Sequence, residues 1–229
     1  MLKNLVRKAC YGNRNYSRLH DEKGNKIAYK LLFLHSPKAI MTGLLRIAFG
    51  YRPLLPWISY SAIDYLQDFL NKEKTVLEFG SGMSTVWYAQ FAKQVASVED
   101  CQPWFQKVKT IFKEKNITNV EYVILTDDAY VGYKSDSGEQ FDLIMIDGSN
   151  RHHCALNAIN LIKEGGIIYL DNSDKHADTL DGDTKLAENV LLDFVKRKKG
   201  ADVIYFTDFA PTTFFVQQGM LCHFKKTNH

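Results

Sequence analysis

Residues 75–85 constrain the fold of this chain more than any other stretch, because a short apolar run ends in glycines and leads directly into a helical pattern. The sequence there is Thr-Val-Leu-Glu-Phe-Gly-Ser-Gly-Met-Ser-Thr. Val76, Leu77 and Phe79 predict a buried strand, and the helical pattern starts at Met83. Glycines let a ligand approach the backbone, and the free N–H groups at a helix N-terminus favour anionic groups. The stretch therefore predicts a ligand-binding turn between a strand and a helix.

Downstream of this turn, apolar strands alternate with amphipathic helices. Strands are expected over residues 75–79, 95–99, 120–125, 141–146 and 166–170, and helices over residues 83–93, 103–115, 152–163 and 184–199. This alternation is typical of a parallel sheet with helices on both faces, a doubly wound α/β fold. Two final β-rich runs, residues 203–206 and 213–217, have no helix between them, so they are expected to pair antiparallel.

The N-terminal quarter of the chain has a different pattern. Residues 1–57 are expected to form a partly helical extension on the substrate side, and residues 58–229 to form the main domain. A helix is expected over residues 31–49, interrupted near Pro37. It is too polar to span a membrane. Two interpretations stay open: helices packed against the domain, which is the favoured one, or weak association with a membrane surface.

Charge and cysteine content exclude some classes of protein. The 229 residues carry a net charge of +3, which gives no argument for nucleic acid as a partner. The basic run at residues 196–199 ends an expected helix, where cations suit the helix dipole. The four cysteines are scattered and lack metal-ligand spacing. This pattern favours reduced thiols in a cytoplasmic protein.

Acidic residues lie at or just beyond the ends of several expected strands, where a doubly wound sheet binds its ligand. They are Glu78, Glu99, Asp127, Asp128, Asp147 and Asp171, the last followed by Asn172. A carboxylate at Glu99 can accept two hydrogen bonds from a ribose diol, and an acid at Glu78 is costly inside the turn unless a donor pairs with it. Plainer interpretations stay open: Glu99 as a helix-capping acid, Asp128 as a loop acid, and Asp171 with Asn172 as turn formers.

The combination resembles the class I S-adenosylmethionine-dependent methyltransferases, in particular small bacterial members similar to O-methyltransferases. The resemblance covers residues 75 to about 218, and its motifs lie at residues 76–82, around Glu99, and at residues 141–148. It implies a Rossmann-like, doubly wound seven-stranded sheet of order 3-2-1-4-5-7-6, with an antiparallel last strand that contains Phe214 and Phe215. It also implies that S-adenosylmethionine is bound by Glu78, Gly80, Gly82, Ser84, Glu99, Asp127, Asp128 and Asp147.

The turn after the fourth strand narrows the acceptor. It lacks the Asn/Asp-Pro-Pro-aromatic sequence of the methyltransferases that act on adenine, so methylation of a nucleic-acid base is not expected. Asp147, with Asp171 and Asn172, resembles the Mg²⁺-binding triad of the catechol and caffeoyl-CoA O-methyltransferases. The lysine that those enzymes carry shortly after the first aspartate is missing, and Asn150 and Arg151 stand there instead. The sequence leaves open whether Mg²⁺ binds here. The expected methyl acceptor is the hydroxyl group of a small molecule or a sugar.

A hydroxyl acceptor has to lose its proton, and the candidate bases are Asp147, His152, His153 and His176. Positioning and desolvation carry most of a methyl transfer from an activated sulfonium. His176 lies in the polar loop of residues 172–183, which is either a lid or a surface loop. Two other functions stay open: another group transfer on the same fold, such as aminopropyl transfer, and a non-catalytic partner protein.

Overall fold

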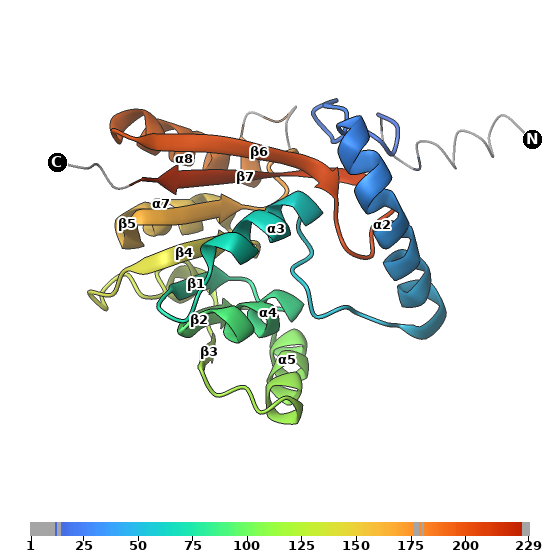
Figure 1. Cartoon of the computed structure of the whole chain (residues 1–229). Helices are drawn as coiled ribbons and strands as arrows, with labels where there is room; N and C mark the ends of the chain where they lie inside the picture. The colour runs from blue at the N-terminus through green and yellow to red at the C-terminus, as the bar shows by residue number, and fades with distance from the viewer. Residues whose placement is uncertain (1–11, 13–14, 176–178, 180, 226–229) are drawn as a thin grey trace, which may run out of the picture.

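Seven strands form one sheet in the order β3-β2-β1-β4-β5-β7-β6 (Figure 1). The computed structural model describes residues 12, 15–175, 179 and 181–225. In sheet order, the strands are β3 (Val120–Ile124), β2 (Gln94–Glu99), β1 (Thr75–Phe79), β4 (Phe141–Ile146), β5 (Ile162–Leu170), β7 (Val216–Phe224) and β6 (Ala201–Phe209). Strands β3 to β5 run parallel to one another, whereas β7 runs antiparallel to both β5 and β6. The doubly wound sheet with an antiparallel last strand is therefore confirmed.

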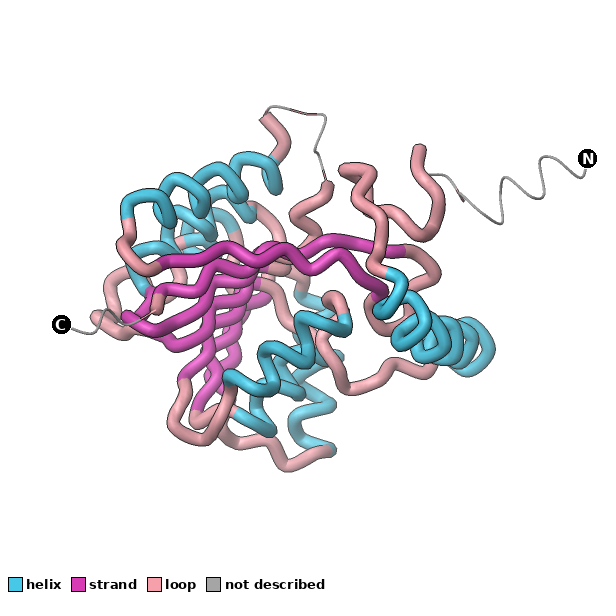
Figure 2. Tube along the Cα trace, turned by 45° about the horizontal axis from the view of Figure 1, so that its top comes forward, coloured by secondary structure: helices cyan, strands magenta, loops and turns pink. Residues whose placement is uncertain are grey.

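Helices cover both faces of the sheet (Figure 2). They are α2 (Tyr29–Phe49), α3 (Tyr60–Phe69), α4 (Met83–Phe91), α5 (Gln102–Glu114), α6 (Asp127–Val131), α7 (Arg151–Leu161) and α8 (Asp183–Arg197). Successive strand residues point to opposite faces. Leu143 and Met145 of β4 therefore pack with α3 and α4, while Ile144 and Ile146 pack with α7 and α8. Burial on both faces explains why residues 143–146 of β4 are all apolar.

Helix α2 is continuous from Tyr29 to Phe49, so the interruption expected near Pro37 is wrong. Proline removes one backbone hydrogen bond, here the bond to the carbonyl of Phe33, and both residues are exposed. Water can therefore replace the missing donor. The helix packs beside the end of β6 (Figure 1), where the buried His35 ring lies 2.6 Å from the Asp208 carboxylate.

The last two strands extend further than their sequence suggests. β6 pairs with β7 from Ala201↔Phe224 to Phe209↔Val216. Phe214 and Phe215 precede β7, so their assignment to the last strand is wrong. The reason is tertiary packing. A Cβ on Gly43 of α2 would lie 2.5 Å from the Phe214 ring, so Phe214 is used to hold α2 rather than to extend the sheet.

Candidate active site

Two turns meet at the carboxyl ends of β1 and β4. Gly80 has a φ of 88°, in the region that favours glycine, and a Cβ added there would lie 2.7 Å from the Cα of Gly148. The Asp147 N–H donates to the Phe79 carbonyl at 3.0 Å, which fixes one turn against the other. Gly82 differs, because a Cβ there would meet no atom closer than 3.7 Å. Gly80 therefore joins the two turns, whereas Gly82 leaves room for a ligand.

The close approach of the two turns predicts a large loss of stability for Gly80→Ala. The variant has to adopt a positive φ and also push the Gly148 backbone away, which together cost about 3 kcal/mol. Gly138→Ala is the matched control, since Gly138 has a φ of 70° but no atom within 4 Å of an added Cβ. Its expected cost is about 1 kcal/mol. Urea unfolding measures both variants, and equal losses would contradict the role given to Gly80.

Glu78 lies near the end of β1, two residues before Gly80, and is 1% exposed. Its carboxylate accepts hydrogen bonds from three hydroxyl groups, those of Ser84 at 2.5 Å, Thr85 at 2.6 Å and Ser97 at 2.8 Å. Burial raises the pKa of Glu78 to about 7, although the three hydroxyl donors partly oppose the shift. A buried acid at this position needs hydrogen-bond donors, and hydroxyl groups from β2 and α4 supply them.

The raised pKa of Glu78 predicts a pH-dependent stability. A carboxyl group with a raised pKa binds its proton more tightly in the folded chain, so its contribution is complete below the ordinary value of 4.5 and is lost as the pH rises to about 7. Glu78→Gln cannot titrate. Between about pH 4.5 and about pH 7.5, its free energy of unfolding should therefore gain on the order of 3 kcal/mol relative to the unsubstituted chain. Urea unfolding across this range checks the change, and a constant difference would contradict it.

Glu99 ends β2 below the glycine turn and is 5% exposed. One carboxylate oxygen accepts the Ser81 hydroxyl at 2.6 Å and the Ser81 N–H at 3.0 Å. The other accepts the backbone N–H groups of Asp100 and Cys101. Glu99 therefore holds the turn from below in addition to any contact with a ligand.

A pocket of about 70 Å³ opens beside the turn. Its lining consists of Leu55, Trp57, Ser81, Gly82, Met83, Ser84, Trp104 and Asp147. The indole N–H of Trp104 donates to the Ser81 carbonyl at 2.7 Å, which fixes that ring against the turn. The guanidinium of Arg52 lies 5.0 Å from the Trp57 ring and 5.3 Å from the Trp104 ring. Two tryptophans, bridged by one arginine, thus form the aromatic wall of the pocket.

Two carboxyl groups from neighbouring strands share this site. Asp147 follows β4 and lines the pocket, and Asp171 follows β5 and is 3% exposed. Burial and the charge of Asp147 raise the pKa of Asp171 well above its usual range, which favours the neutral form of Asp171. The Asp171 Oδ1 atom has no hydrogen-bond partner among the described residues. Burial also raises the pKa of Asp147, but the neighbouring Arg151 guanidinium opposes that shift, so Asp147 is the better placed of the two to carry the negative charge.

Arg151 balances the charge of this pair. Its guanidinium donates to Oδ1 of Asp147 at 3.2 Å, to the Gly148 carbonyl at 3.0 Å and to the Asp171 carbonyl at 2.8 Å. It thereby ties the turn after β4 to the turn after β5. The site therefore combines the partly buried guanidinium of Arg151 with the carboxyl groups of Asp147 and Asp171.

Comparison with known proteins identifies the domain. Residues 77–173, which include both turns and both acids, match a family model described as a methyltransferase domain. The sheet order is that of class I. Residues 77–173 carry a methyltransferase domain. No curated protein matches this chain.

Solved structures resemble the methyltransferase chain in fold. The O-methyltransferase from Bacillus cereus in complex with SAH has a TM-score of 0.63 and 15% identity, covering 82% of this chain and 99% of that one. Cofactor-bound Rv0187 from MTB has a TM-score of 0.60 and 20% identity, covering 83% and 98%. An rRNA methylase from Streptococcus thermophilus has a TM-score of 0.54 and 15% identity, covering 78% and 100%. An O-methyltransferase and an rRNA methylase share this fold, so the fold alone does not select the acceptor.

The other predicted site residues lie outside the pocket lining. Asp127 and Asp128 are exposed in the first turn of α6, a helix that the sequence pattern did not predict. His152 and His153 begin α7, with ring centroids 5.0 Å apart. His176 lies outside the described residues. The structure therefore brings Gly82, Ser84 and Asp147 to the pocket directly, with Glu78 and Glu99 behind its wall.

The site does not fit Mg²⁺. The Arg151 guanidinium already donates to the Asp147 carboxylate, and the raised pKa of Asp171 favours its neutral form, which is a poor ligand for a cation. Asn172, the third proposed ligand, has a φ of 52° and is 9% exposed. Among the described residues, no group of three or more His, Cys, Asp or Glu side chains is arranged to hold a metal ion. A cationic side chain stands where the resemblance implied a metal.

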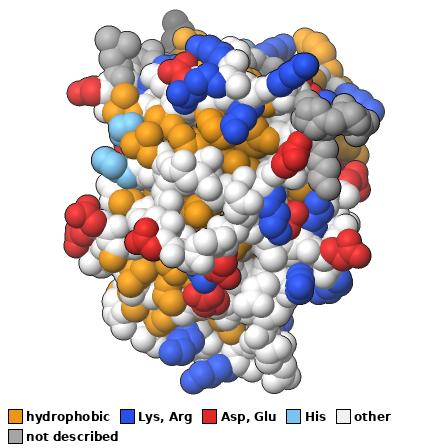
Figure 3. All heavy atoms as spheres, turned by 90° about the vertical axis from the view of Figure 1, so that its left-hand side faces the viewer, with side chains coloured by type: hydrophobic (Ala, Val, Ile, Leu, Met, Phe, Trp, Pro, Cys, Tyr) orange, Lys and Arg blue, Asp and Glu red, His pale blue; other side chains and the backbone are white. Residues whose placement is uncertain are grey.

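A larger hollow of about 670 Å³ lies near the amino-terminal ends of β4 and β5, on the side of the molecule that faces the viewer in Figure 3. Its lining includes Lys163, Lys198, Lys199 and Phe224. Glu78, Glu99, Asp147 and Asp171 do not line it. Lys163 is paired with Asp142 at 2.9 Å. This hollow is therefore separate from the candidate site.

Three features of the site were missed or left undecided in the sequence. Trp57 and Trp104 have no motif around them, and an aromatic residue alone predicts a core position equally well. Arg151 stands out only as a departure from the lysine of the related O-methyltransferases. Asp183, at the start of α8, accepts the N–H groups of Arg151 and His152 and thereby caps α7. A cap from another helix has no signature in the capped sequence.

Proposed function

We propose that this chain is an S-adenosylmethionine-dependent methyltransferase that methylates the hydroxyl group of a small molecule or a sugar. The observation that carries the proposal is the pair of neighbouring carboxyl groups of Asp147 and Asp171 at the edge of the pocket, where burial raises the pKa of both. A partly exposed carboxylate with a raised pKa is suited to accept a proton from a hydroxyl group. An O-methyltransferase among the proteins of similar fold supports the same reaction type.

The glycine turn fits the amino acid tail of the cofactor. Ser84 both lines the pocket and donates its hydroxyl to Glu78, so it stands between that acid and the ligand. A positively charged amino group beside Ser84 would stabilise the ionised form of Glu78. Gly82 leaves the room that the tail requires, and Glu99 lies behind Ser81, where the ribose of the cofactor is expected. When bound, S-adenosylmethionine supplies a methyl group on a positively charged sulfur atom.

The chain's own residues then position the acceptor and remove its proton. Asp147 lines the pocket and would accept the proton of the acceptor hydroxyl, whose oxygen would take the methyl group that the bound cofactor supplies. Asp171 lies beside Asp147, and the Arg151 guanidinium, which donates to Asp147, would balance the charge of the pair. Trp57 and Trp104 in the pocket lining would limit the access of water to the acceptor.

The N-terminal extension contributes to the acceptor side in this proposal. Leu55 and Trp57 line the pocket, and both belong to residues 1–57. Arg46 of α2 lies 4.8 Å from the Trp57 ring, which connects α2 to the pocket wall. Cys101, Cys154 and Cys222 are free thiols, and this supports the proposed cytoplasmic location.

Isothermal titration and a methyl-transfer screen test this function. Titration with S-adenosylmethionine and S-adenosylhomocysteine should give saturable binding, and absence of binding to both would refute the proposal. Tighter binding of decarboxylated S-adenosylmethionine would favour aminopropyl transfer instead. The screen offers sugars, diols and phenols and measures S-adenosylhomocysteine. Binding without turnover on any of these hydroxyl acceptors would leave only the partner-protein function or another acceptor class, and would refute the hydroxyl assignment.

A further inference from the structure

Helix α2 exposes a row of large apolar side chains along its whole length. Tyr29, Phe33, Ile40, Leu44 and Ile47 recur at the spacing of one helix face and are 66%, 78%, 49%, 56% and 75% exposed, respectively. We call these five residues the outer face of α2. Leu34, Met41 and Phe49 are also exposed and extend the apolar surface along the same helix. A continuous apolar surface of this length on a folded domain indicates an interaction site.

The outer face is not needed to hold α2 on the domain. The helix packs through His35, Ala39 and Gly43, its buried residues. Ala39 and Gly43 are small residues, and Gly43 packs directly against the Phe214 ring. The sequence thus assigns small residues to the contact with the sheet and large apolar residues to the surface.

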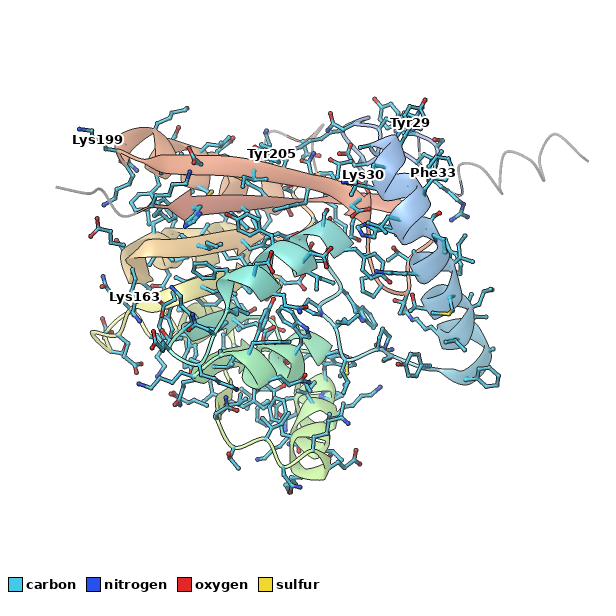
Figure 4. The ribbon with its side chains drawn as sticks, in the orientation of Figure 1. Tyr29, Lys30, Phe33, Lys163, Lys199 and Tyr205 are labelled. Carbon is cyan, nitrogen blue, oxygen red and sulfur yellow. The ribbon has the colours of Figure 1, made fainter. Side chains whose placement is uncertain are left out.

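Charge is distributed unequally along the chain. Residues 1–63 contain eleven Lys and Arg but only two acids, Asp21 and Glu22, which gives a net charge of +9. Residues 64–229 carry the remaining −6 of the total of +3. Lys30 and Lys38 lie on α2, which contains no acidic residue, and Arg52 follows it closely. Figure 4 shows Lys30 beside Tyr29 and Phe33 on α2, whereas Lys163 and Lys199 lie at the opposite end of the molecule. Such an asymmetry indicates an anionic partner for the N-terminal part.

We propose that the outer face of α2 docks onto the surface of an anionic lipid bilayer. A basic helix with exposed aromatic and aliphatic residues lies in the plane of the interface, its apolar side chains inserted at the boundary of the acyl chains. Each Lys or Arg near the surface adds attraction to anionic headgroups. Among the described residues, no helix is long and apolar enough to cross a bilayer, so α2 lies on the membrane rather than through it.

Two other occupants fit the surface less well. A second copy of the chain would bring two N-terminal regions of net charge +9 together, and like charges oppose that contact. The phosphates of RNA would attract the basic residues, but they would not bury the five apolar side chains of the outer face. An anionic bilayer would both attract the basic residues and bury the apolar side chains.

A second apolar feature adjoins the outer face. A hollow of about 550 Å³ lies between α2 and the β6–β7 connection, and its lining includes Leu32, Ile40, Phe209 and Phe214. Ile40 belongs both to this hollow and to the outer face. The hollow offers an apolar space for part of an acyl chain next to the docked helix.

Sedimentation with lipid vesicles tests the proposal. The full chain should bind vesicles of phosphatidylcholine mixed with phosphatidylglycerol at least about tenfold more strongly than vesicles of phosphatidylcholine alone, and added salt should weaken the binding. Combining Phe33→Ser with Ile47→Ser should lower the affinity at least about tenfold, because two inserted side chains are lost. Both residues are exposed, and serine has a helix propensity close to theirs, so the fold should persist.

Matched control variants distinguish binding through the outer face of α2 from non-specific binding of the protein to vesicles. Leu156→Ser replaces an exposed leucine of α7 and should leave binding unchanged. Lys30→Glu should weaken binding to the anionic vesicles several-fold, whereas Lys199→Glu at the other end of the molecule should not. Far-UV circular dichroism confirms that each variant is folded.

Three results would overturn the proposal. They are failure to bind anionic vesicles, binding to an RNA probe in place of vesicles, and a dimer in light scattering that Phe33→Ser dissociates. The measurement needs neither cofactor nor methyl acceptor, so its outcome is independent of the proposed methyltransferase activity.

Discussion

Replacing Asp147 with asparagine is expected to lower the rate of methyl transfer by about 10²- to 10³-fold, the range that general-base catalysis contributes. The amide cannot accept the proton of the acceptor hydroxyl at neutral pH. Because Asp147 is partly exposed and Ser84 and Gly82 are untouched, the variant should still bind S-adenosylhomocysteine and unfold cooperatively. Steady-state kinetics measures the loss, and it should lie in kcat rather than in KM.

Asp171→Asn is the matched control for this prediction. Asp171 is expected to be a neutral acid that donates a hydrogen bond to Asp147, and an asparagine amide can donate in the same way. The rate should therefore fall less than about tenfold, far less than with Asp147→Asn. If Asp147→Asn stayed within about threefold of the unsubstituted enzyme, Asp147 would not be the base. Equal losses in both variants would indicate that the pair has only a structural role.

Replacing Glu99 with alanine is expected to abolish measurable binding of S-adenosylmethionine. The substitution removes the acid that the ribose is expected to contact and also frees the Ser81 N–H and hydroxyl, which Glu99 holds at 3.0 Å and 2.6 Å. Loss of charge-assisted hydrogen bonds to a ligand and to the turn below it costs several kcal/mol. Isothermal titration measures the affinity. Retention within about threefold, which is well under 1 kcal/mol, would refute the assignment of Glu99.

Two further variants separate ligand contact from support of the turn. Ser81→Ala removes the hydrogen bond from the Ser81 hydroxyl to Glu99 but leaves the Glu99 carboxylate in place. This variant should weaken cofactor binding only several-fold. Asp128→Ala removes an exposed acid at the end of the neighbouring strand. A strong loss with Asp128→Ala would reinstate it as an adenine contact, although it lies outside the pocket in the structure. Thermal unfolding without ligand should be cooperative for all three variants.

The order of helices and strands could be predicted because it is written in local patterns. Val76, Leu77 and Phe79 before Gly80 predict a buried strand and its turn, and the structure has β1 at Thr75–Phe79. The absence of a helix between the last two strands predicts an antiparallel pair, which β6 and β7 form. Their lengths were not predictable, because the start of β7 is set by Phe214 packing against α2 and by β5, its other neighbour.

The sequence predicted which acidic residues form the site, but it did not predict which of them are ionised. Glu78, Glu99, Asp147 and Asp171 could be named because each lies at or directly after the end of a strand. Whether such an acid is ionised depends on its burial and on its partners. The three hydroxyl groups that donate to Glu78 come from β2 and α4, and the pKa of Asp171 is raised because Asp171 is buried beside Asp147. Those contacts join segments that are distant in the sequence.

The sequence by itself determined the sheet, its glycine turn and the row of acids at its edge, since periodicity and strand ends are local properties. Only the tertiary structure decided that Arg151 takes the position expected for a metal, that Trp57 and Trp104 line the pocket, and that α2 turns its large apolar residues outward. Each of these depends on which surfaces are left after distant segments have packed, and burial and pKa follow from that packing.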